Sequence, residues 1–235
     1  MERINHESIS RSNISNELAG SNPELFKSVL LELLKTETKF SSQIWDTLCQ
    51  RDEINSNKVA IDSKNWTSNS NMKTGSIHFG AKQMSENFNE ELIFEDWKFK
   101  EEKQLVYRLS HEISHFVIPK LLGLFNYKND NPHIASKNFF EILYDVRSKG
   151  KGFTPLGSLE FYKKDGEIEQ ANEDHAELIN MYLIDPEYLK RYLTFLSNDK
   201  YEGVRNEKDL VTITPDIAEN VFKLIEDSIK FFRSE

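Results

Sequence analysis

The sequence has a single cysteine, Cys49, among its 235 residues. One cysteine cannot form a disulfide within the chain, and it excludes a zinc site built from several thiolates. No apolar run approaches the length of about 18 residues that a membrane span requires, and the first residues lack the apolar segment of a secretory signal. We therefore expect a cytoplasmic protein with no membrane partner, although leaderless secretion is compatible with the same sequence.

Basic residues are also fewer than acidic residues. The chain has 30 Lys and Arg against 39 Asp and Glu, which gives a net charge of −9. Proteins that bind nucleic acids through the phosphate backbone need a surplus of Lys and Arg, and so do proteins that bind anionic membrane surfaces. The composition thus argues against a nucleic-acid or membrane partner. It does allow a core, because 38% of the residues are hydrophobic.

The order of the patterns predicts an α+β fold, in which a small sheet packs on helices. Residues 1–20 are polar and predict a flexible tail, and apolar residues at helical spacing predict a helical segment over 21–56. The rest, 57–235, reads as one domain. Its expected strands lie near 59–61 and 76–80, joined by a polar loop. The helices that we expect after them cover about 98–122, 136–147, 167–183, 186–196 and 215–232.

The most informative motif is His111-Glu112-Ile113-Ser114-His115, which reads HExxH. Two imidazoles four residues apart lie one turn from each other on the same face of a helix. Both Nε2 atoms can then reach one metal ion, with Glu112 beside it as a general base, which is the arrangement of zinc peptidases. The apolar stripe of this helix excludes both histidines, so we expect them to face a cleft rather than the core.

A catalytic zinc site needs a third protein ligand. The residues after His115 lack the Gly and His that complete the metzincin pattern, so this ligand must come from further along the chain. Glu169, Glu173 and Glu177 share one face of a later helix, and helical phase alone does not choose among them. Three stacked carboxylates would repel one another, and a Zn²⁺ ion would relieve that repulsion.

The combination of an HExxH helix with a later helix reading Glu-x-x-Ala-Glu resembles the gluzincin peptidases of the anthrax lethal factor type, which include the Pro-Pro endopeptidases. In that family the first Glu is the third zinc ligand, and it falls on Glu173, with Ala176 and Glu177 completing the match. The resemblance covers about residues 100–232. It implies a zincin-like fold and a zinc-dependent endopeptidase.

Two positions differ from that family. Ser114 stands where its HExxH usually contains Gly, and the family's tyrosine, which steadies the oxyanion, would fall near Gly166. Tyr162 is the nearest tyrosine, so the resemblance implies this catalytic role for it.

The same later helix is also similar to that of the ImmA/IrrE-type metallopeptidases. These have an Ala three residues after the ligand Glu and a Pro thirteen residues after it, as Glu173, Ala176 and Pro186 do here. This resemblance implies, as an alternative, a regulatory peptidase that cuts a repressor. Both families place the third ligand at Glu173.

The expected function is hydrolysis of a peptide or protein substrate by a water molecule that Zn²⁺ activates. Ile77, His78 and Phe79 form a candidate edge strand on which an extended substrate could add by β-pairing, and an ordinary place inside the sheet is equally compatible with them. The alternative outside enzymes is a zinc-binding domain that interacts with a partner. The intact Glu112 argues against that alternative, because a structural zinc site needs no base.

Overall fold

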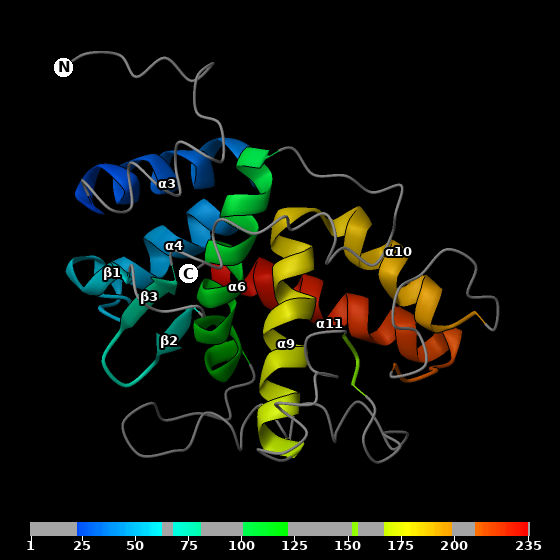
Figure 1. Ribbon diagram of the computed structural model, residues 1–235. Coiled ribbons are helices and arrows are strands. Elements are labelled where there is room, and N and C mark those ends of the chain that lie inside the picture. Colours follow the sequence, from blue (N-terminus) through cyan, green and yellow to red (C-terminus); the bar gives the residue numbers. More distant parts are fainter. Residues whose placement is uncertain are drawn as a thin grey trace.

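Figure 1 shows a computed structural model of the chain, which describes residues 23–62, 68–80, 101–121, 152–154, 167–198 and 210–234. Within these ranges the chain has six α-helices and one three-stranded mixed sheet, which confirms the expected α+β class. The tail expected over 1–20, the helix expected over 136–147 and the candidate oxyanion donor Tyr162 lie outside the described residues.

Two N-terminal helices, α3 (Pro23–Glu37) and α4 (Ser41–Gln50), form where the helical spacing predicts them. α3 starts with proline at its first position and has an acid in its first turn and a lysine in its last, as the orphan amides and the helix dipole favour. Both helices pack against α6 (Glu101–Leu121) and bury their apolar faces in one core shared with the rest of the described chain.

The sheet contains β1 (Val59–Asp62), β2 (Asn69–Asn71) and β3 (Ser76–Gly80), in the order β1-β3-β2. A short 3₁₀-helix, η3 (Ser56–Lys58), leads into β1. β3 pairs in parallel with β1 and antiparallel with β2.

The strand predicted near 76–80 is therefore confirmed, but its predicted place at the edge of the sheet is wrong. The backbone groups of β3 are already engaged on both sides, so no substrate strand can add to it. Ile77 and Phe79 are buried in the core, and only His78, on the other face of the strand, is partly exposed. Substrate addition by β-pairing at these three residues is therefore excluded.

β2 lies inside the polar stretch that the sequence predicts as a loop. Its three residues, Asn69, Ser70 and Asn71, have little intrinsic preference for strands, so the pattern gives no signal for it. The strand forms because it pairs with the buried β3, with Ser70 opposite Ile77. Among the described strands β2 pairs with β3 alone, which makes β2 one of the two edges of the sheet.

The turn between β2 and β3 depends on Gly75. Its φ of +65° is in the left-handed region, and its carbonyl accepts a hydrogen bond from the Asn55 amide at 2.9 Å. A Cβ here would lie 2.6 Å from the Glu53 carbonyl oxygen. We expect Gly75→Ala to lower the free energy of unfolding by about 1–3 kcal/mol, from left-handed strain and this overlap. Urea unfolding measures the loss, with Lys73→Ala in the same turn as the control; equal stability of the two variants would contradict the role of Gly75.

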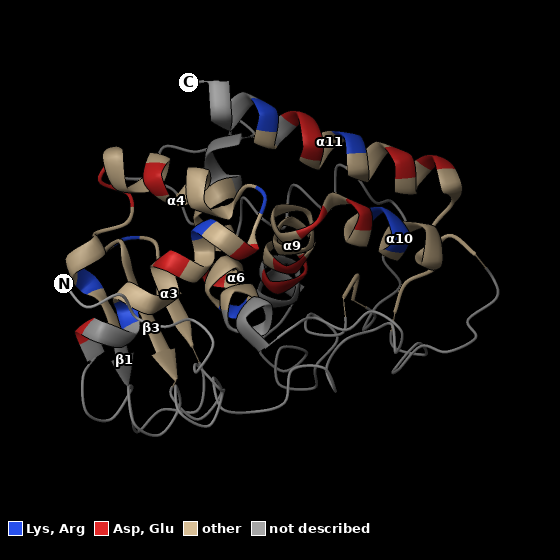
Figure 2. Cartoon of the chain, turned by 90° about the horizontal axis from the view of Figure 1, so that it is seen from above, with Lys and Arg blue, Asp and Glu red and all other residues tan. Residues whose placement is uncertain are grey.

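α6 and α9 (Glu167–Ile184) run side by side through the middle of the molecule (Figure 1). The sheet, α3 and α4 lie on the α6 side, and α10 (Pro186–Leu196) lies on the α9 side. α11 (Pro215–Ser234) crosses behind both central helices, and Figure 2 shows acidic and basic residues alternating along it. None of the described helices is long and apolar enough to cross a membrane.

α6 is buried on every side in its middle part. Each residue from Val106 to Val117 is buried, including the polar ones. The two histidines do lie off the apolar stripe, but they face the neighbouring helix α9 instead of open solvent, with His111 9% and His115 5% exposed. A helix in this position can hold polar groups only if the helix beside it supplies partners for them.

Candidate metal centre

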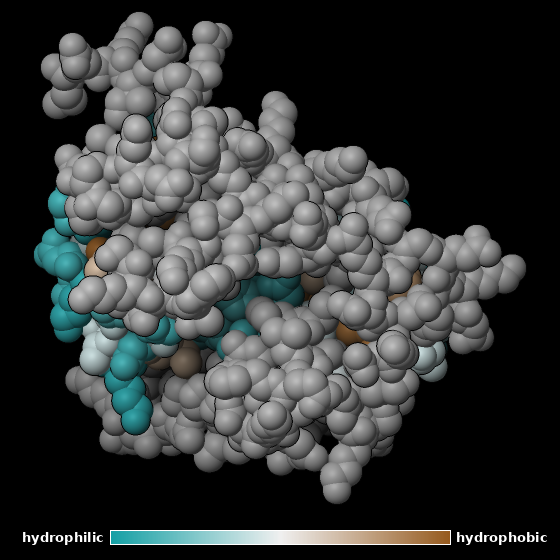
Figure 3. All heavy atoms as spheres, in the orientation of Figure 1, coloured by the Kyte–Doolittle hydropathy of each residue, from teal (hydrophilic) through white to brown (hydrophobic). Residues whose placement is uncertain are grey.

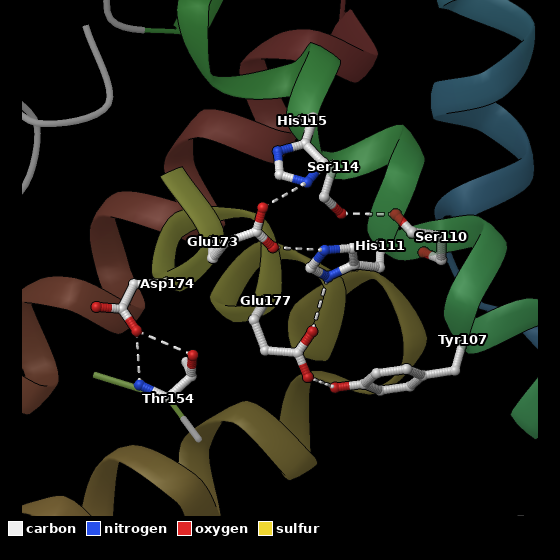
Figure 4. Close-up of polar contacts among 9 residues, drawn as sticks. All are labelled: Tyr107, Ser110, His111, Ser114, His115, Thr154, Glu173, Asp174 and Glu177. Atoms are coloured by element: carbon white, nitrogen blue, oxygen red, sulfur yellow. Dashed lines mark hydrogen bonds and ion pairs between the residues drawn. The ribbon is translucent and has the colours of Figure 1, made fainter. Parts of the chain in front are cut away.

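The two histidines of the HExxH motif lie together on α6, as helical geometry requires. Their ring centroids are 4.9 Å apart and the ring planes are nearly perpendicular (Figure 4). Both Nε2 atoms turn towards α9.

Glu173 of α9 faces these histidines. Its Oε2 lies 3.3 Å from Nε2 of His111, and its Oε1 lies 3.9 Å from Nε2 of His115. One ligand atom from each residue falls within 4.8 Å of the other two. Zinc bonds of about 2.0–2.1 Å in a tetrahedron put neighbouring ligand atoms about 3.4 Å apart. The spacing of the three side chains therefore fits a zinc ion, and two imidazoles with one carboxylate are ligands that zinc prefers.

Glu177 lies on the other side of the His111 ring. Its Oε2 is 2.8 Å from Nδ1 of His111, so it does not converge with Glu173 on the two Nε2 atoms. A carboxylate can only accept a hydrogen bond, so the proton of the neutral imidazole resides on Nδ1 and Nε2 keeps its lone pair for a metal. Of Glu173 and Glu177, the two of these acidic residues whose side chains are described, the geometry thus selects Glu173. The side chain of Glu169 is outside the described part.

Electrostatics favour a positive charge beside His111. Burial alone would lower the pKa of His111, but hydrogen bonds and charge from Glu173 and Glu177 outweigh it and hold the pKa well above its usual range. In the metal-free molecule a proton on His111 therefore separates two buried carboxylates. A metal ion bound to Nε2 would provide the positive charge that this proton supplies.

Glu112 points to a different neighbour, the edge strand β2. It is 6% exposed, and the Ser70 hydroxyl donates a hydrogen bond to its carboxylate. Burial raises the pKa of Glu112 to about 7, with a lowering contribution from His111, a raising one from Glu173 and a lowering one from the Ser70 hydrogen bond. A carboxyl group with a pKa near neutrality can both take up and release a proton, as a general base must.

The orientation of α9 is fixed by the residue that follows Glu173. Asp174 is fully buried and accepts hydrogen bonds from the Phe153 amide at 2.9 Å and from the amide and hydroxyl of Thr154 at 2.7 and 2.9 Å (Figure 4). The Phe153 carbonyl in turn accepts from the Tyr192 hydroxyl of α10. Asp174 thus anchors the face of α9 next to the one that carries Glu173.

His175 is buried as well and does not join the cluster. Burial lowers its pKa well below the usual range, with further lowering from the charges of His115 and His111, while a hydrogen bond to the Ser114 backbone opposes this. His175 thus lies buried between α9 and the HExxH helix, in contact with the Ser114 backbone.

Cys49 lacks the lowered thiol pKa of a nucleophilic cysteine. The thiol is partly buried, and burial together with the charge of Asp46, opposed by Lys27, raises its pKa to about 11. A thiol with this pKa stays protonated at neutral pH and is unreactive.

Three contributors to the site are not evident from the sequence: Tyr107, Ser70 and Asp174. Tyr107 carries the clearest signal, because it precedes His111 by four residues and so lies on a neighbouring part of the same helix. Ser70 and Asp174 carry none, since their roles depend on contacts between segments far apart in the chain.

No protein-family model matches the chain, and no curated protein or solved structure shows significant similarity to it. The function must therefore be inferred from the site itself.

Proposed function

We propose that this chain is a zinc-dependent endopeptidase. The observation that carries the proposal is the convergence of His111, His115 and Glu173 on one point between α6 and α9. Beside that point stands Glu112, an acid that the three ligands do not require. A site that only stabilised the fold would have no use for such a group, whereas a hydrolase needs one.

His111, His115 and Glu173 would hold the ion and leave its fourth position open. Bound Zn²⁺ would polarise the scissile carbonyl and lower the pKa of a water molecule towards neutrality. Glu177 orients His111 so that Nε2 faces the ion. The site is drier than the surface, because all three ligands are largely buried, and charge effects are stronger there than in water.

Glu112 performs the proton transfers. As a carboxylate it takes the proton from the attacking water and then passes it to the nitrogen of the leaving amine. Without a metal the pKa of Glu112 is about 7. A cation held by the neighbouring ligands would lower this pKa, so Glu112 would be a carboxylate that is able to take the proton. The Ser70 hydroxyl holds the carboxylate against β2 through its hydrogen bond.

β2 takes the substrate role that the sequence suggests for β3. It is an edge strand, it contacts α6, and its Ser70 lies against Glu112. An extended peptide added to its outer edge would run past the general base, held by main-chain hydrogen bonds. Asn69 and Asn71 are exposed, and the surface around the sheet is hydrophilic in Figure 3.

The first test is metal content together with proteolysis. The purified chain is expected to bind one zinc ion, measured by elemental analysis after dialysis, and to cleave members of a peptide library. A chelator should abolish cleavage and added Zn²⁺ should restore it. The control is His78→Ala, which removes a histidine of β3 that is not among the convergent ligands and should leave the zinc content unchanged.

Each other result has a distinct meaning. A chain that binds no zinc would overturn the proposal. A chain that binds zinc with the expected ligands but cleaves no peptide in the library would be a zinc-stabilised interaction domain. Cleavage confined to one folded repressor protein, with no library peptide cut, would favour the regulatory peptidase that the ImmA/IrrE resemblance implies.

A further inference from the structure

Tyr107 lies one turn before His111 on α6 and contacts the cluster through Glu177. Its side chain is 2% exposed, and its hydroxyl donates a hydrogen bond to Oε1 of Glu177 (Figure 4). The other oxygen of that carboxylate, Oε2, binds Nδ1 of His111 at 2.8 Å. The three side chains form a continuous chain of hydrogen bonds, in which Glu177 is the middle member.

Both oxygens of Glu177 are therefore engaged, each by a different donor on α6. A carboxylate held at one oxygen only can rotate about its last side-chain bonds, whereas two donors fix both its position and its plane. The plane of the carboxylate determines where the Nδ1–H of His111 points, and hence where Nε2 points. Because Glu173 approaches that Nε2 to 3.3 Å, a small rotation of the imidazole would change the geometry of the whole cluster.

The phenol is suited to a permanent donor role. Burial raises the pKa of Tyr107 well above its usual range, and the charge of Glu177 and the nearby Tyr188 of α10 raise it further. The hydroxyl therefore keeps its proton over the range of pH at which proteins work. If Tyr107 only filled space in this part of the core, phenylalanine would serve equally well. Phenylalanine, however, has no hydroxyl to donate a hydrogen bond to a buried carboxylate.

We propose that Tyr107 is a positioning residue for the metal: acting through Glu177, it holds His111 in the orientation and tautomer that bind Zn²⁺. This inference rests on the proposed function only as far as the metal site, and not on peptide cleavage. It adds a residue on the HExxH helix itself to the set that determines metal affinity.

The test measures zinc affinity, by competition with a chromophoric chelator, in a double-mutant cycle. Tyr107→Phe is expected to weaken zinc binding about tenfold, and Glu177→Ala, which removes both hydrogen bonds of the carboxylate, about 10- to 100-fold, the range known for partners behind metal-binding histidines. If Tyr107 acts through Glu177, Tyr107→Phe should change the affinity less than about twofold when Glu177→Ala is already present. Co²⁺ in place of zinc gives a second readout, since its visible absorption spectrum should shift in Tyr107→Phe.

The matched control is Tyr182→Phe. It also deletes a buried phenol hydroxyl, but the ring of Tyr182 lies against Phe40 and Phe222 and not beside Glu177. This variant should leave zinc affinity and the Co²⁺ spectrum unchanged, whatever its effect on thermal stability. It separates a change in fold stability from a loss of metal positioning, because both variants lose a hydroxyl group from a buried tyrosine.

Two outcomes would overturn the inference. One is wild-type zinc affinity in folded Tyr107→Phe. The other is an effect of Tyr107→Phe that is just as large in the Glu177→Ala background, which would mean that Tyr107 acts on the metal by another route. If the wild type itself binds no zinc, the proposed metal site is wrong, which is a different result from either of these. Should Tyr107→Phe prove unfolded, Glu177→Ala with a wild-type affinity would equally disprove the proposed chain of contacts.

Discussion

Glu112→Gln is expected to lower kcat/KM for a cleaved peptide by about 10²–10⁴-fold, the range that positioned general acids and bases contribute. The amide has the size of the carboxyl group and can still accept the Ser70 hydroxyl, so it should occupy the same place. It cannot take a proton from water, and this is the step that fails. Zinc content should remain at the wild-type level, because Glu112 is not among the three convergent ligands.

The matched control for this variant is Glu187→Gln. Glu187 is exposed in the first turn of α10 and is not among the convergent ligands, so the same chemical change there should alter kcat/KM less than twofold. Activity of Glu112→Gln close to the wild-type value would remove Glu112 from the mechanism. Loss of zinc together with loss of activity would mean instead that Glu112 supports the ligands.

Glu173→Gln is expected to lose zinc binding itself, and with it the cleavage of peptides. An amide oxygen is neutral and a weaker ligand than a carboxylate, so affinity should fall by more than the roughly 100-fold upper range of effects from residues behind the ligands. The thermal shift with added zinc measures this directly. A ligand present at about 1,000 times its Kd stabilises the folded state by about 4 kcal/mol, and the variant should show almost none of that gain.

Glu219→Gln, on the exposed side of α11, is the control for this second variant and should keep the full zinc-dependent shift. If Glu173→Gln retained that shift, another acidic residue would be the third ligand. Taken together, the two substitutions separate the roles: Glu112→Gln should bind zinc without cleaving, and Glu173→Gln should do neither.

The helices of this fold could be predicted because their apolar residues recur at helical spacing. The position of a strand within the sheet could not be predicted in this way. Ser76–Gly80 reads as a strand from its own residues, but whether it is central depends on what pairs with it, and β2 gives no local signal because Asn and Ser favour loops. The edge position expected for Ser76–Gly80 is therefore wrong because β2, which pairs with it on one side, cannot be recognised from its own residues.

The residues of the candidate site also differ in how well the sequence predicts them. His111, Glu112 and His115 are recognisable because one helical turn brings them together whatever the rest of the chain does. Helical phase does not choose between Glu173 and Glu177, since the two glutamates share a face. The family resemblances point to Glu173, and the structural reason for it is the rotation of α9 relative to α6, which only the folded chain shows. Tyr107 could be noticed by its spacing, but its partner Glu177 is 70 residues away and only the folded chain brings them into contact.

The complete burial of α6 from Val106 to Val117 has a consequence for the way in which the site works. Backbone segments that are packed on all sides open only when much of the domain unfolds, so they are the slowest to exchange their amide hydrogens. The HExxH residues therefore stand on a segment that we expect to open rarely. Catalytic dipoles that do not move need no reorganisation when charge develops on the substrate. On binding, the substrate and the edge strand β2 would then change conformation, while the metal ligands keep the positions that they have in the folded chain.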